Sequence, residues 1–196
     1  MNGEKLKNKI KKRAKEIGAQ PQELMQMYFF ERLLYRISIS RYKFNFILKG
    51  GLLLSAIIGD ERRTTSDMDT MIKGIDIESD ELLKIIQEII NIKTDDNISF
   101  EIEKTKDIRV DDIYGGVNVK LIAKKDGLIV PLFIDITTKD PITPREIEFK
   151  YKSLFDDTYI KIMAFNKETI IAEKFETLIK DTETNTRAKD FYDLYI

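Results

Sequence analysis

Two aspartates on one expected strand are the residues of this sequence best suited to chemistry. Asp67 and Asp69 lie in the run Ser66-Asp67-Met68-Asp69, and residues at i and i+2 of a strand project from the same face. The two carboxylates can therefore share a cation, while Met68 points to the core behind them. Such a pair alone is more often an exposed turn or edge, so it needs support from elsewhere in the chain.

Two glycines precede these aspartates, between a short apolar run and a short helical run. Gly50 and Gly51 would let the backbone approach a triphosphate closely, and the N-terminus of the following helix would supply amide donors and a positive dipole. Arg63 and Ser66 lie on the stretch between Gly51 and Asp67. Such glycines also serve for packing alone, but their combination with the paired aspartates favours a phosphate site.

A third carboxylate, Asp135, interrupts the apolar run Leu132-Phe133-Ile134-Asp135-Ile136. A charge in such a strand needs a partner. Two divalent ions about 4 Å apart, as used in in-line phosphoryl transfer, need a third carboxylate beside the first two. We expect Asp135 to supply it, with a salt bridge at the strand end as the alternative.

The C-terminal part holds a second charged cluster. Lys174, Arg187 and Lys189 could cover phosphates, while Asp190 could orient them or contact a substrate hydroxyl. At helical spacing, however, Lys189 with Asp193 and Arg187 with Asp190 equally fit surface ion pairs of little energetic weight. Taken alone, this cluster favours the ion pairs.

Composition removes several classes of enzyme. The 196 residues include no Cys and no His, which excludes serine–histidine triads, Cys–His enzymes and zinc hydrolases, and the remaining carboxylates and hydroxyls suit Mg²⁺ and phosphates. The 33 Lys and Arg against 34 Asp and Glu leave a net charge of −1, so any polyanion binding must be local. A charged start without a signal peptide, and no apolar run near the roughly 18 residues of a membrane span, predict a soluble, cytoplasmic protein.

The elements that must position these residues begin with a helical segment, 1–42, packed on the core. Pro21 opens its main helix, as proline at a first turn should. The basic residues before it fit either a solvated helix face, which we favour, or a phosphate-binding arm; they are Lys5, Lys7, Lys9, Lys11, Lys12, Arg13 and Lys15.

Residues 43–165 are expected to form the core. A strand over 44–48 leads through the glycines to a short helix over 52–58, a strand over 66–72 and a helix over 79–92 capped by Ser79. Alternation then predicts strands beginning near 98, 117, 128, 147 and 159, with hairpin turns at 126–127 and 155–158. Pro131 argues for an edge position or a bulge in its strand.

The last segment, 166–196, is expected to be helical and to carry the second charged cluster. One helix covers 167–180 and another begins at Arg187. No repeat or Pro/Gly-rich linker divides the chain.

Four ordered blocks of this sequence resemble the AbiEii family of nucleotidyltransferase toxins. They are Phe46-Ile47-Leu48-Lys49-Gly50-Gly51, Arg63-Thr64-Thr65-Ser66-Asp67-Met68-Asp69, Ile134-Asp135-Ile136, and Ala172-Glu173-Lys174 with Arg187-Ala188-Lys189-Asp190-Phe191-Tyr192-Asp193. The resemblance runs from about Met25 to the last residue. It implies an α+β, DNA polymerase β-like nucleotidyltransferase fold: a small mixed sheet flanked by helices, with the third aspartate on a strand next to the first two.

The resemblance also implies the toxin half of a bacterial toxin–antitoxin, or abortive-infection, system. Such a toxin transfers a nucleotide from an NTP to an acceptor hydroxyl, with tRNA 3′ ends as the acceptor in related toxins, and its antitoxin need not contact it. Carried over, Asp67, Asp69 and Asp135 would be catalytic and hold Mg²⁺ or Mn²⁺. In a sequence without His a carboxylate is the only common base, and our hypothesis is that Asp135 takes the proton of the hydroxyl. Lys174 and Asp190 would match the family's essential C-terminal motif.

The same blocks supply the expected nucleotide contacts, which are Lys49, Gly50, Gly51, Arg63, Ser66, Arg187 and Lys189. Relatives usually continue with a helical domain beyond the last motif, so this sequence is expected to be a short or truncated member. Two other functions stay open: a nucleotidyltransferase acting on a small molecule or a protein, and an NTP-binding regulatory module without turnover. Charge reversal at Lys9, Lys11 and Lys12 would separate an RNA acceptor from a small one.

Overall fold

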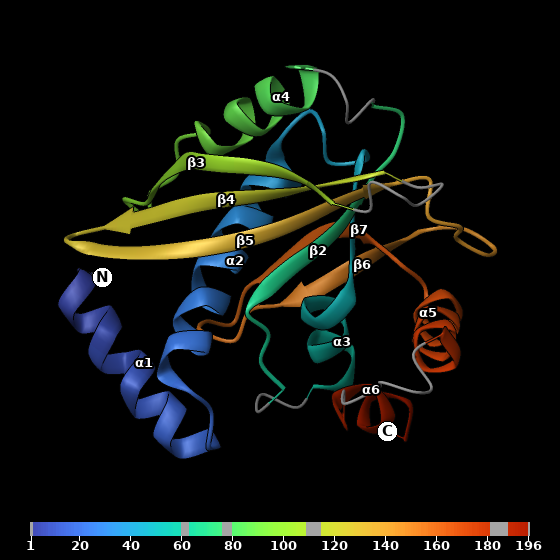
Figure 1. Ribbon diagram of the computed structural model, residues 1–196. Helices are drawn as coiled ribbons and strands as arrows, with labels where there is room; N and C mark the ends of the chain where they lie inside the picture. The colour runs from blue at the N-terminus through green and yellow to red at the C-terminus, as the bar shows by residue number, and fades with distance from the viewer. Residues whose placement is uncertain (1, 60–62, 76–79, 109–114, 181–187, 196) are drawn as a thin grey trace.

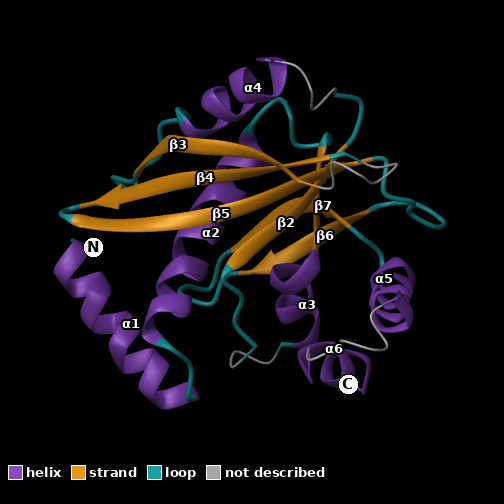
Figure 2. Cartoon of the chain, in the orientation of Figure 1, coloured by secondary structure: helices purple, strands orange, loops and turns teal. Residues whose placement is uncertain are grey.

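The computed structural model describes residues 2–59, 63–75, 80–108, 115–180 and 188–195 of the chain. They form one seven-stranded sheet with helices against both faces (Figures 1 and 2). The strands are β1 (Phe46–Lys49), β2 (Asp67–Ile72), β3 (Ser99–Ile108), β4 (Gly116–Lys125), β5 (Leu128–Thr138), β6 (Ile147–Lys152) and β7 (Tyr159–Ala164). The helices are α1 (Gly3–Ile17), α2 (Pro21–Ile39), α3 (Gly50–Ile58), α4 (Asp80–Ile90), α5 (Lys167–Lys180) and α6 (Ala188–Tyr195).

The sheet is mixed, in the order β3-β4-β5-β2-β1-β7-β6. β2 pairs with β5 and β1 pairs with β7 in parallel, while the other neighbours are antiparallel. This confirms the expected α+β class. Both expected hairpins are present, β4–β5 around Asp126-Gly127 and β6–β7 around 155–158.

Pro131 lies on β5, between β4 and β2 in the sheet, but at a position where β5 has a neighbouring strand on one side only. β5 pairs with β4 from Leu128 to Thr137, but with β2 only from Phe133 onward. The missing N–H of Pro131 therefore interrupts no ladder, because no strand pairs with β5 on that side. The expectation of a local edge position is confirmed.

Two helices at the N-terminus pack on each other and then on the sheet. Pro21 is the first residue of α2, as expected, and α1 buries Leu6, Ile10 and Ala14 against α2. The lysines of α1 are exposed on its other side, and one of them, Lys9, donates a hydrogen bond to the carbonyl of Phe155 at 2.7 Å. They thus form a solvated helix face.

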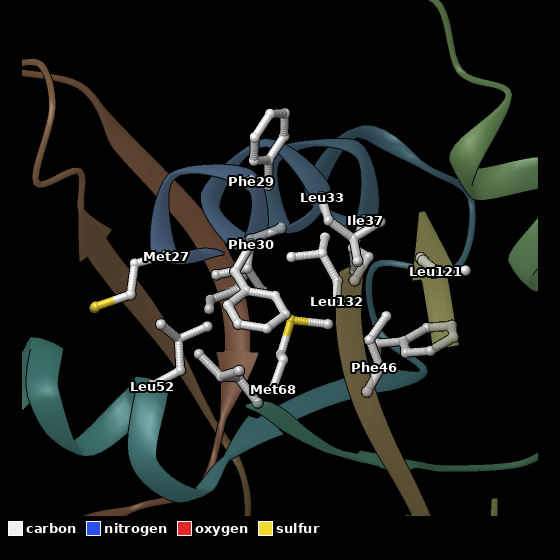
Figure 3. Close-up of a cluster of buried hydrophobic side chains, with 14 of the residues drawn as sticks. Met27, Phe29, Phe30, Leu33, Ile37, Phe46, Leu52, Met68, Leu121 and Leu132 are labelled. Atoms are coloured by element: carbon white, nitrogen blue, oxygen red, sulfur yellow. The ribbon is translucent and has the colours of Figure 1, made fainter. Parts of the chain in front are cut away.

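The core lies between α2 and one face of the sheet (Figure 3). Phe30, Leu33 and Ile37 of α2 meet Met68 of β2 and Leu132 of β5 there, and all five are buried. Because strand side chains alternate, burial of Met68 on this inner face turns Asp67 and Asp69 to the opposite, outer face.

Different helices cover the two faces of the sheet. α2 and α4 pack on the inner face, whereas α3 packs on the outer face over β1, β2 and β6, with α5 and α6 beside it (Figure 1). In the view of Figure 2, α2 passes behind β4 and β5, and α3 lies in front of the sheet. The expected cap of α4, Ser79, lies outside the described residues. In the part of the chain that the structure describes, no helix is long and apolar enough to cross a membrane.

Candidate active site

Three aspartates meet on the outer face, where β2 and β5 run side by side. The parallel register makes Asp69 and Asp135 Cα partners, and Asp67 precedes Asp69 by two residues on the same face. Their neighbours Met68 and Ile134 are buried on the inner face, while all three aspartates are half-buried. The structure therefore brings together the three carboxylates that the sequence singled out.

Gly50 and Gly51, which we call the glycine turn, lie at the start of α3, and Gly50 lies directly against Asp69. Gly50 has a φ of +62°, and a Cβ placed on it would stand 1.9 Å from Oδ2 and 2.7 Å from Cβ of Asp69. Asp69 also accepts a hydrogen bond from the backbone N–H of Gly51. Only glycine fits this position, because both the backbone conformation and the space exclude a side chain. The first turn of α3 thus begins at the carboxylates.

The carboxylates repel one another. Burial, followed by the charges of Asp67 and Asp135, raises the pKa of Asp69 from 3.8 to about 6, although Lys49 and the Gly51 N–H act in the opposite direction. A cation placed among these groups would remove that repulsion. The sequence could not reveal this shift, because it depends on the register of two strands.

Polar neighbours orient the carboxylates of Asp67 and Asp135. Thr65 Oγ1 donates to Asp67 Oδ1 at 2.7 Å, and Asn118 Nδ2 on β4 donates to Asp135 Oδ1 at 2.5 Å. As these side chains lie, no three acidic groups among the described residues converge on one metal position. Their chemistry nevertheless fits a hard divalent ion, which prefers oxygen ligands. Sequence reasoning gave Asn118 no role; its signal was a polar residue opposite Asp135 in the expected hairpin.

Lys49, which we expected at the nucleotide, has two carboxylate partners inside the protein. Its Nζ lies 2.5 Å from Asp140 Oδ2 and 2.8 Å from Glu173 Oε1, and Thr137 donates to Asp140 as well. Burial lowers the pKa of Lys49, but Glu173 and Asp140 outweigh it and the pKa is raised. Lys49 therefore ties α5 to the end of β1, next to the glycine turn.

A second ion-pair cluster joins the loop before β2 to both C-terminal helices. Arg63 binds Asp193 with two hydrogen bonds, Nε to Oδ1 at 2.8 Å and Nη2 to Oδ2 at 2.7 Å, and Lys174 Nζ lies 3.1 Å from the same Oδ2. Burial raises the pKa of Asp193, but these two cations more than offset it and the pKa is lowered. The structure thus brings the expected site residues Arg63 and Lys174 together, through an aspartate that the sequence suggested only for a surface pair.

Comparison with known proteins identifies the family. A family model described as the nucleotidyl transferase AbiEii toxin of type IV toxin–antitoxin systems matches residues 32–196. The chain belongs to the AbiEii family. A search of curated proteins gives no match.

Solved structures share the fold of this AbiEii chain. JHP933 from Helicobacter pylori is 18% identical with a TM-score of 0.54, over 90% of this chain and 66% of that one. A putative nucleotidyltransferase from H. pylori is 19% identical with a TM-score of 0.55, over 90% and 68%. An antigenic nucleotidyltransferase-like protein from Paracoccidioides brasiliensis is 16% identical with a TM-score of 0.50, over 84% and 74%. This AbiEii chain therefore has a nucleotidyltransferase fold and spans about two thirds of the H. pylori chains.

The remaining expected residues of the AbiEii blocks are placed in part. Ser66 is exposed in the bend before β2. Lys189 and Asp190 belong to α6, but their side chains lie outside the described part of the structure, as does the whole of Arg187. Their expected roles stay predictions.

Proposed function

We propose that this chain is a nucleotidyltransferase that moves a nucleotide from an NTP to a hydroxyl of tRNA, as the toxin of a toxin–antitoxin pair. The observation that carries the proposal is the register of β2 and β5, which sets Asp69 beside Asp135 and under the glycine turn. Family membership supports the reaction class and the toxin role.

The three aspartates would hold one or two Mg²⁺ ions, or Mn²⁺ in their place. Bound there, the ions would neutralise the triphosphate and lower the pKa of the attacking hydroxyl. The raised pKa of Asp69 supports this assignment, because repulsion among the carboxylates favours a cation between them. The donor set of carboxylates, in a chain without His or Cys, points to the same ions.

Asp135 would accept the proton of the attacking hydroxyl. Asn118 occupies its Oδ1, which leaves Oδ2 for the substrate. Gly50 and Gly51 would receive the triphosphate, because the N-terminus of α3 presents backbone amides and a positive dipole at the carboxylates. Since the sequence lacks His, a carboxylate is the only common base on offer.

Arg63 and Lys174 would contact the departing pyrophosphate. Asp193 binds both side chains and so holds these two cations, which come from different elements, close to each other. Asp190, Arg187 and Lys189 would complete this side of the site.

The test is incubation of the protein with Mg²⁺, each labelled NTP and total bacterial tRNA, beside a variant with Asp67→Ala and Asp69→Ala. We expect label in tRNA with the wild type alone. Label on a small molecule or a protein would mean that this molecule, and not tRNA, is the acceptor. Mg²⁺-dependent NTP binding with no pyrophosphate release would indicate a regulatory module. The family's antitoxin is the expected partner, and direct contact with it is not required.

A further inference from the structure

Half of the outer face of the sheet carries no helix among the described residues. α3 covers β1, β2 and β6 there, whereas β3, β4 and β5 face the viewer uncovered in Figure 1. The exposure of the strands agrees: Val119 and Leu121 of β4 are buried on the inner face, while Asn118 and Lys120 on the outer face are half-buried. Asn118 of β4 is the Cα partner of Asp135 on β5, so this open surface adjoins the carboxylates.

An exposed aromatic ring stands at the border between the open face and the carboxylates. Phe133 is 38% exposed, although its strand neighbours Leu132 and Ile134 are buried. It is the Cα partner of Asp67, and it precedes Asp135 by two residues on the same face of β5. Strand geometry therefore places the Cα of Phe133 about 5–7 Å from the Cα atoms of both aspartates.

Lysines flank this ring on the neighbouring strands. Lys120 is the Cα partner of Phe133, and its Nζ lies 5.9 Å from the ring centroid. On β3, Lys104 is the Cα partner of Lys120, and Lys106 is the Cα partner of Asn118. Because two strand spacings separate β3 from β5, their Cα atoms lie about 10 Å from those of Phe133 and Asp135.

These lysines differ in their partners. Lys104 and Lys106 are exposed and make no ion pair with any residue that the structure describes, whereas Lys120 pairs with Glu103 at 2.5 Å. Further from the site, Lys124 pairs with Glu101 at 2.6 Å. The positive charge left without a partner is therefore on the side of the face nearer to Asn118 and the aspartates.

We infer that the open face of β3, β4 and β5 binds the acceptor as a single strand of RNA. A base stacks on Phe133, and phosphates contact Lys104 and Lys106. A sheet that presents an aromatic ring between cations is a common platform for single-stranded nucleic acid, because stacking accepts any base and lysines follow the backbone. The inference rests on the proposed function and names the surface that presents the hydroxyl to Asp135.

The lysines of α1 do not serve this purpose. α1 packs on α2, the helix that covers the inner face of the sheet, so its basic side is separated from the aspartates by α2 and the sheet. Lys7 and Lys11 of α1 are as exposed as Lys104 and Lys106, which makes them a matched control. A phosphate-binding arm on α1, the alternative that we did not favour from the sequence, and RNA binding by the open face thus predict opposite results in one experiment.

The experiment measures binding of a labelled 12-nucleotide single-stranded RNA by the full chain, with KM for total tRNA as a second readout. We expect Phe133→Ala to weaken binding about 5- to 150-fold and Phe133→Tyr to restore it, because the tyrosine ring still stacks. Replacing Lys104 and Lys106 by Gln should lower the slope of log affinity against log salt by about 1.4, that is about 0.7 for each lost phosphate contact. Replacing Lys7 and Lys11 by Gln should leave that slope unchanged.

Failure of the inference and failure of the proposed function give different results. If the wild type labels tRNA but Phe133→Ala and the Lys104/Lys106 variant keep the wild-type KM for tRNA and the salt slope, the face is not the acceptor site and the transfer stands. If the wild type binds RNA through these residues without transfer, the inference holds and the function fails. If the wild type binds no RNA, the inference is overturned, whatever acceptor it labels.

Discussion

Replacement of Asp69 by Asn should stabilise the metal-free protein while it abolishes nucleotide transfer. In the folded chain the pKa of Asp69 is raised from 3.8 to about 6, so between these values the folded state binds more protons than the unfolded state. The wild type therefore loses stability as the pH rises from about 4 to about 6, and the loss is complete above that range. An asparagine carries no charge and avoids this loss.

The magnitude follows from the size of the shift. About two pKa units correspond to about 3 kcal/mol of unfolding free energy at pH 8, since one unit is about 1.4 kcal/mol. For a chain of this length that is a rise in Tm of about 6–12 °C. The amide oxygen of the new side chain keeps the hydrogen bond from the Gly51 N–H, so the replacement leaves that packing in place.

Urea unfolding followed by circular dichroism measures the effect, at pH 8 and at pH 4, in EDTA and in excess Mg²⁺. The variant should be more stable at pH 8 in EDTA and close to the wild type at pH 4. Mg²⁺ should stabilise the wild type alone, because the ion binds the folded carboxylates. A variant that is equal to or less stable than the wild type at pH 8 in EDTA would refute the picture of a buried Asp69 crowded by two neighbouring carboxylates.

Three further predictions concern other contacts. Gly50→Ala should lower the Tm more than Gly59→Ala and should abolish transfer. Both glycines have positive φ, but a Cβ at Gly50 would collide with Asp69, whereas a Cβ at Gly59 would have no atom within 4 Å. Lys49→Met should cost about 3–5 kcal/mol in urea unfolding by leaving Asp140 buried without its cation, and Asp140→Asn in the same chain should recover part of it. If Lys49 also contacts the nucleotide, the double variant will retain a raised KM for NTP. Burial raises the pKa of Glu31 to about 7, despite hydrogen bonds from the Leu154 N–H and Ser153. The wild type should therefore lose about 3 kcal/mol of unfolding free energy as the pH rises from about 4.5 to 7, and Glu31→Gln should remove this loss. Equal pH profiles of stability for the two proteins would contradict the prediction.

Local patterns in the sequence predicted most of the elements. Alternation identified the strands, proline and glycine marked where helices begin, and Asp67 and Asp69 were assigned to one face because neighbouring strand residues point in opposite directions. Pro131 even indicated a missing neighbour on one side of β5. These features depend on residues close in the chain, so a single sequence carries them.

The rest of the site depends on contacts between distant residues. Lys49 meets Glu173 across 124 positions and Arg63 meets Asp193 across 130, and no local pattern indicates such pairs. The spacing of Lys189 and Asp193 suggested a pair along one helix, whereas Asp193 binds Arg63 and Lys174. The order of the strands has the same origin, because parallel pairing of β2 with β5 brings together residues 66 positions apart, such as Asp69 and Asp135.

The contact of Asp193 with Arg63 and Lys174 has a consequence for the timing of synthesis. A ribosome completes the carboxylates and the glycine turn long before it reaches Asp193, whose side chain is fully buried between the two cations. Until then the carboxylate that binds both Arg63 and Lys174 is missing, so it cannot offset the repulsion between these two cations. A nascent or prematurely terminated polypeptide that stops before Asp193 would therefore lack the assembled cation pair, even though it already carries the three aspartates and both glycines.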